Sequence, residues 1–144
     1  MDKWIEKEFL INSLVSTTWE YLTSPQLMRK WMAEPQMNVE VITDWVVGNP
    51  ILIKGFHHTK FENKGKVLQF EPYKIIQYSH LSSISRLPDT IENCALIALL
   101  LTPMENKTLL SLKIENFPTE SIYKHMDFYW NGTMAILKKC IEQQ

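Results

Sequence analysis

Tyr78 and His80 are the residues of this sequence whose types and spacing best suit a binding site. Together with Ile76 they form an alternating row in a stretch rich in apolar residues, and residues two apart on a strand point to the same face. The row therefore places an imidazole, which titrates near neutral pH, beside a phenol on a mostly apolar wall. This pattern predicts polar groups that line a pocket. The alternative is a structural histidine whose hydrogen bonds are satisfied at the rim of the sheet.

A second row of large side chains lies near the end of the chain. Met126, Trp130 and Met134 recur at steps of four residues, the spacing of one face of a helix that must cover the sheet. Methionine adapts to irregular surfaces, so this face suits either a ligand or a filled core. Trp31 is expected to close the helical side of the same space. The predicted ligand-binding residues are therefore Trp31, Tyr78, His80, Met126, Trp130 and Met134.

The other residues capable of chemistry do not assemble into a site. Cys94 and Cys140 lack the close cysteine and histidine spacing of a zinc site and are expected to be reduced, buried thiols. His57 and His58 are adjacent, so on a strand they would point to opposite faces and could not share one metal ion. The sequence thus predicts no catalytic residue, no metal and no cofactor.

Length and composition indicate one soluble domain over residues 1–144. The formal net charge is −1 and 45% of the residues are hydrophobic, so no strong field attracts nucleic acid. The longest apolar run, Ala95 to Leu101, is far shorter than the roughly 20 residues of a membrane span. Charges scattered through the first residues do not fit a secretory signal. We therefore expect a cytoplasmic protein without membrane insertion.

Periodicity along the chain predicts an α+β fold. Strands are expected near residues 4–12, 38–46, 51–58, 64–71, 74–82, 94–103 and 107–115, with Asn63-Lys64-Gly65 among the turns. Ser16 or Thr17 should cap one short helix, and Ser24-Pro25 should start another. Thr119 should begin a final helix of roughly 22–25 residues.

Particular residues at these positions resemble the AHSA1-like branch of the START-related, or SRPBCC, superfamily. The resemblance is carried by Trp19, Thr23-Ser24-Pro25 and Trp31, by Gly65-Lys66-Val67, Glu71-Pro72 and Tyr78, and by Trp130 and Leu137. Tyr129 departs from it, because a polar residue often precedes this tryptophan. The resemblance implies a helix-grip fold, in which a curved antiparallel sheet of six to seven strands surrounds a long C-terminal helix, with two short helices after the first strand.

The resemblance also implies a function. Helix-grip proteins commonly leave a cavity between sheet and helix, so we expect binding of an apolar or amphipathic small molecule whose identity the sequence does not give. One alternative is a protein-interaction or stress-response module without a ligand, acting on a protein partner or as a homodimer. A cyclase or hydrolase, with His80 transferring a proton and Tyr78 assisting, is the less favoured alternative. Hsp90 activation is not expected, since the eukaryotic activators carry an additional N-terminal domain.

Overall fold

A seven-stranded antiparallel sheet forms the body of the protein. The structure is a computed structural model that describes residues 3–143, apart from the side chain of Ile84. Its strands follow the spatial order β1-β7-β6-β5-β4-β3-β2, and every neighbouring pair is antiparallel. The strands are β1 (Ile5–Ile11), β2 (Glu40–Thr43), β3 (Pro50–His57), β4 (Thr59–Glu71), β5 (Ile75–His80), β6 (Ala95–Met104) and β7 (Lys107–Glu115). The predicted sheet is confirmed.

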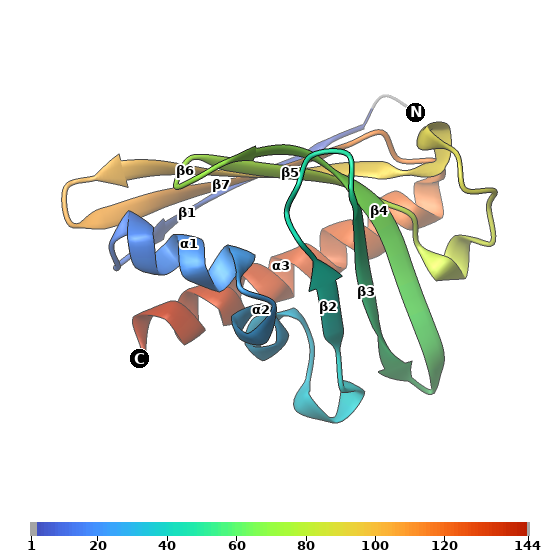
Figure 1. The fold of residues 1–144 in the computed structure, drawn as a ribbon, viewed down its shortest axis with the longest axis horizontal. Helices are drawn as coiled ribbons and strands as arrows, with labels where there is room; N and C mark the ends of the chain where they lie inside the picture. The colour runs from blue at the N-terminus through green and yellow to red at the C-terminus, as the bar shows by residue number, and fades with distance from the viewer. Residues whose placement is uncertain (1–2, 144) are drawn as a thin grey trace.

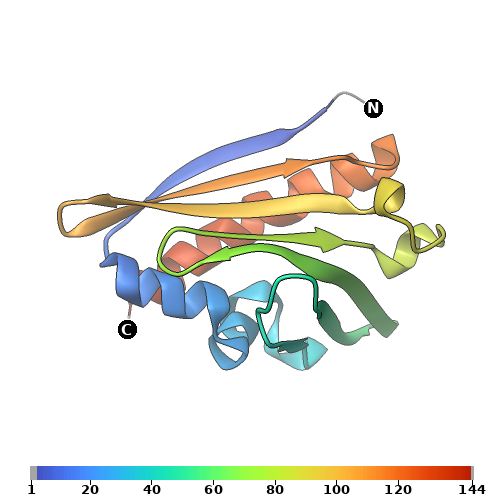
Figure 2. The same cartoon turned by 45° about the horizontal axis from the view of Figure 1, so that its top comes forward.

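Three helices lie on one face of this sheet (Figures 1 and 2). They are α1 (Val15–Thr23), α2 (Pro25–Met32) and α3 (Glu120–Glu142), the last with 23 residues. Helix α3 begins as predicted, because the Thr119 hydroxyl accepts a hydrogen bond from the Ile122 backbone N–H at 3.1 Å. Helix α2 carries a proline at its first position, where the missing N–H costs nothing. The α+β helix-grip architecture is therefore as expected.

The start of α1 differs from the prediction. Leu14 occupies the N-cap position, and Ser16 and Thr17 lie inside the helix. A hydroxyl in the first turn does make a hydrogen bond: Thr18 Oγ1 donates to the Leu14 carbonyl at 3.1 Å. The predicted serine or threonine cap is therefore wrong, because the N-cap residue Leu14 makes no side-chain capping hydrogen bond.

Strand β4 also differs, because the predicted turn Asn63-Lys64-Gly65 lies within it. The chain reverses instead at His58, which has a left-handed backbone with φ of 64°. Gly65 is needed for another reason: a Cβ atom there would lie 1.7 Å from the Ser79 carbonyl oxygen on β5. The glycine permits close approach of two strands rather than a turn.

Strand β4 carries the curvature of the sheet. Its pairing with β5 shifts register between Val67 and Gln69, which marks a bulge, and bulges bend the strand that carries them. In Figure 1, β2, β3 and one end of β4 turn away from β1, β6 and β7, toward the side on which α3 lies. The sheet thus curls around one long helix.

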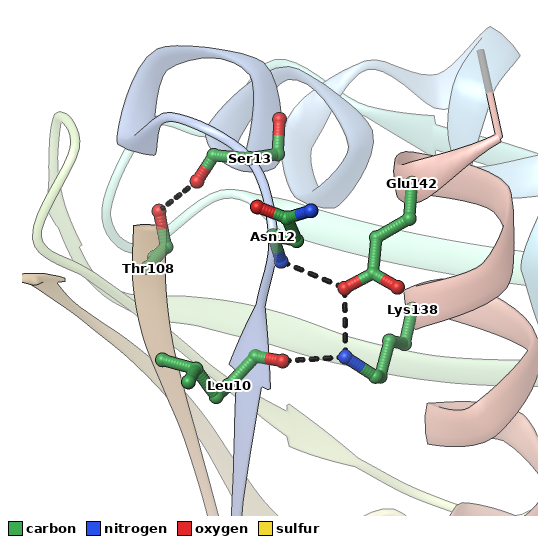
Figure 3. A network of polar contacts seen from close by, with 6 residues as sticks. All are labelled: Leu10, Asn12, Ser13, Thr108, Lys138 and Glu142. Carbon is green, nitrogen blue, oxygen red and sulfur yellow. Dashed lines mark hydrogen bonds and ion pairs between the residues drawn. The ribbon is translucent and has the colours of Figure 1, made fainter. Parts of the chain in front are cut away.

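The C-terminal end of α3 is tied to the end of β1 by polar contacts (Figure 3). Glu142 Oε2 accepts from the Asn12 backbone N–H at 2.7 Å and pairs with Lys138 Nζ at 2.7 Å. Lys138 Nζ also donates to the Leu10 carbonyl at 2.6 Å. These contacts join the last turn of α3 to β1, while the buried apolar row of α3 faces the sheet.

None of the helices described between residues 3 and 143 combines the length and hydropathy required to cross a bilayer.

Candidate ligand site between strand β5 and helix α3

The six residues predicted to bind a ligand come together between the sheet and α3. Five of them belong to one continuous core and are less than 5% exposed: Trp31, Tyr78, Met126, Trp130 and Met134. The sixth, His80, lies two residues beyond Tyr78 at the end of β5 and is partly buried. The phase predicted for both the strand and the helix therefore places these side chains in one region.

Aromatic contacts fix the apolar part of this region. The Trp31 ring from α2 lies 6.3 Å from the Trp130 ring of α3, measured between centroids. Trp31 Nε1 donates to the Tyr21 carbonyl at 2.8 Å, which satisfies its polar atom within the core. Trp130 is also contacted edge-on by Tyr129 at 5.5 Å. The two tryptophans thus join α2 and α3 over the inner face of the sheet.

His80 has a buried polar atom that no group in the described part of the chain satisfies. Its Nδ1 is inaccessible to water and has no hydrogen-bond partner among the described residues. Burial, followed by the charge of nearby His125, lowers the pKa of His80 to about 4. The imidazole is therefore neutral at physiological pH, and one of its nitrogens lacks the partner that buried polar groups normally have.

Tyr78 brings a phenol to the same wall. Its ring meets Trp45 edge-on at 6.3 Å, and burial raises the pKa of its hydroxyl. The phenol of Tyr129 on α3 lies near enough to raise this pKa further. Tyr78 is thus a neutral hydrogen-bonding group near a second phenol, that of Tyr129 on α3.

Tyr129 was not predicted as a site residue. Its hydroxyl donates to the Met32 carbonyl at 2.5 Å, and burial raises its pKa to about 12, opposed by a hydrogen bond with Thr133. His125, Tyr129 and Thr133 recur at steps of four on α3, so they share one flank of the helix. That spacing was a readable signal, but the prediction followed the apolar row beside it.

These residues form what we call the polar seam: Tyr78 and His80 from β5, and His125, Tyr129 and Thr133 from α3. The seam contains imidazoles, phenols and a hydroxyl. The ionisable neighbours that shift the pKa values of Tyr78 and His80 are Tyr129 and His125.

Lys7, on the inner face of β1, is paired with Asp127 of α3 at 3.2 Å. Asp127 lies two residues from His125 and from Tyr129, so this ion pair belongs to the opposite flank of the helix.

An open hollow of about 420 Å³ lies elsewhere, where α1 and α2 meet the end of α3. It is lined by Tyr21, Lys30, Lys139, Cys140 and Gln143. Lys30 and Lys139 occupy the last turns of their helices, where cations oppose the helix dipole. Cys140 is partly exposed rather than buried as predicted, and its thiol donates to the Lys30 carbonyl at 3.8 Å. Helix termini alone account for this arrangement.

The chain belongs to the family of Activator of Hsp90 ATPase homolog 1-like proteins, whose model matches residues 13–142. This confirms the resemblance found in the sequence. No curated protein matches the chain.

Solved structures share the fold of this chain. Protein ChR145 from Cytophaga hutchinsonii is 30% identical, with a TM-score of 0.81 over 99% of this chain and 96% of that one. CV1439 from Chromobacterium violaceum is 18% identical, with a TM-score of 0.83 over 99% of both chains. A dimer of Aha1 from Colwellia psychrerythraea is 20% identical, with a TM-score of 0.77 over 97% of this chain and 96% of that one. The last two show a shared fold.

Proposed function

We propose that this protein binds an apolar or amphipathic small molecule between the sheet and α3. The observation that carries the proposal is the buried Nδ1 of His80, which has no hydrogen-bond partner among the described residues. An unpaired buried polar atom costs free energy, and a ligand that supplies its partner would recover that cost. Trp31, Met126, Trp130 and Met134 would surround the apolar body, because pockets are typically apolar with few polar groups.

Binding requires the core to open, since four of these wall residues are almost fully buried. Met126 and Met134 are flexible and could yield space for a ligand at low cost. On binding, contacts with the ligand would therefore replace contacts among these side chains, and His80 and Tyr78 would orient the polar end of the ligand. We place this activity in the cytoplasm.

The test is a titration with a panel of lipids and aromatic metabolites, followed by NMR of methyl-labelled methionine. Compounds that bind should shift the Met126 and Met134 signals. Met104 is 48% exposed at the end of β6 and serves as an internal control. Unchanged Met126 and Met134 signals with every compound, or equal shifts at Met104, would contradict binding at this site.

A second candidate function is self-association through the outer face of α3. Phe128 is 83% exposed and Ile136, two turns further along the helix, is 49% exposed. Exposed apolar side chains that form a contiguous patch can mark an interaction site, and the Colwellia psychrerythraea relative is a dimer. Sedimentation of the protein and of Phe128→Lys tests this idea. A monomer at all concentrations would contradict it.

A further inference from the structure

The free nitrogen of His80 restricts what can bind beside it. The neutral imidazole carries one N–H and one acceptor nitrogen, and Nδ1 can be either. A group that both donates and accepts hydrogen bonds would satisfy Nδ1 in both tautomers. The Tyr129 hydroxyl already donates to the Met32 carbonyl, so toward a ligand it presents acceptor lone pairs. Both observations favour a polar end that carries at least one N–H or O–H donor.

The seam offers little compensation for a charge. It contains no lysine, arginine, aspartate or glutamate. Lys7, on the inner face of β1, is paired with Asp127 on the other flank of α3. His125 is exposed on α3, so water screens any interaction that it makes with a buried charge. An ion buried without a partner is far costlier than a neutral polar group.

We infer that the polar end of the ligand is an uncharged group that donates and accepts hydrogen bonds, such as a hydroxyl, and that the site rejects carboxylates, phosphates and ammonium groups. This inference rests on the proposed function and narrows it to a ligand class. It excludes free fatty acids and phospholipid head groups as occupants of the seam, and it favours alcohols and phenols with an apolar body.

The test compares probes that differ only in their polar end. One series is octan-1-ol, octanoate and octylammonium, and the other is 2-naphthol, 2-naphthoate and 2-naphthylmethylammonium. Calorimetry and methionine methyl NMR at pH 8, above the ordinary titration range of histidine, give the affinity of each. We expect the hydroxyl compound of at least one series to bind about tenfold or more tightly than its charged counterparts, because those would be buried without compensation.

Substitution of His80 tests the contact itself. His80→Phe should weaken binding of the preferred hydroxyl probe by about fivefold to tenfold, the effect of one hydrogen bond. His57→Phe is the matched control, because His57 is exposed at the distant β3–β4 turn, and it should leave the affinity unchanged. The comparison of the six probes on the unchanged protein is decisive even if a variant fails to fold.

Each outcome separates this inference from the proposed function. Equal or tighter binding of a carboxylate or ammonium probe would overturn the inference and leave the proposed function standing. If neither these six probes nor any compound of the panel binds and the Met126 and Met134 signals stay unchanged, the proposed function itself fails. Unchanged affinity in His80→Phe would show that another group holds the polar end.

Discussion

Two polar residues of the seam differ in how far the sequence could predict them. The period-two row correctly placed His80 on the face that it shares with Tyr78. That Nδ1 has no partner among the described residues could not be predicted, because it depends on how α3 packs against β5, and these two elements are far apart in the sequence. Tyr129 was read only as a departure from the family pattern, yet its hydroxyl joins α3 to the end of α2. A phenol on the flank of an apolar stripe resembles a surface residue until the neighbouring helix is placed.

The His80 imidazole should make stability depend on pH. Its pKa falls from an ordinary 6.5 to about 4 in the folded protein, so between these values the unfolded chain binds a proton that the folded protein does not. Stability should be fully present above about pH 6.5 and should fall as the pH drops toward 4, by about 2–3 kcal/mol. Urea unfolding from pH 7.5 to 4.5 measures this change.

The variant His80→Phe isolates this contribution from that of the carboxylates. It should lack this part of the pH dependence, and at pH 7.5 it should be at least as stable as the unchanged protein, because it removes an unpaired polar atom. His57→Phe should keep the original profile. Parallel profiles for the unchanged protein and His80→Phe would contradict the lowered pKa, and a loss of about 1–3 kcal/mol at pH 7.5 would show a satisfied structural histidine.

At the scale of elements, Gly65 could be interpreted either as part of a turn or as a position where two strands approach closely. Asn63-Lys64-Gly65 has the composition of a turn, but it lies in the middle of β4, where Gly65 permits the close approach of β5. Local sequence cannot distinguish these roles, because the need for glycine arises from a strand placed later in the chain. The helices were easier to predict. Helix α3 has a threonine cap and an unbroken apolar stripe, and both signals are local.

Two glycine substitutions with opposite expected effects test this account. Gly65→Ala should destabilise the protein by more than about 3 kcal/mol, because its Cβ would lie 1.7 Å from the Ser79 carbonyl oxygen and neither strand can yield. Gly132→Ala on α3 meets no atom within 4 Å and should stabilise the helix by about 0.5–1 kcal/mol. Thermal unfolding of both variants gives the comparison. A mild effect of Gly65→Ala would mean that the strands separate easily.

For the whole molecule, the sequence predicted the architecture well and the interior poorly. The order of elements, the antiparallel pairing and the long final helix follow from periodicity and turn residues. Whether Trp31, Met126, Trp130 and Met134 surround a space or fill it depends on how the side chains of α2 and α3 pack against the curled sheet. The sequence favoured a ligand site only slightly over a filled core, and the structure has these residues tightly buried.

A single core predicts a single unfolding transition. Trp19, Trp31 and Trp130 lie on three different helices and belong to one continuous core, so none should be released before the others. Guanidinium unfolding followed by tryptophan fluorescence and by far-ultraviolet circular dichroism should give coincident curves. A separate early fluorescence transition would show that one helix detaches while the sheet persists.

The pairing of β1 has a consequence for synthesis on the ribosome. Ile5 pairs with Ile114 and Ile11 pairs with Thr108, while Lys138 and Glu142 hold the end of the strand. Strand β1 is therefore synthesised well before its partner β7, about 100 residues further along the chain. Until then its apolar row stays uncovered and open to association with other nascent chains. Slow codons between β1 and β7 would lengthen that interval, and a chaperone that covers the first strand would shorten its exposure.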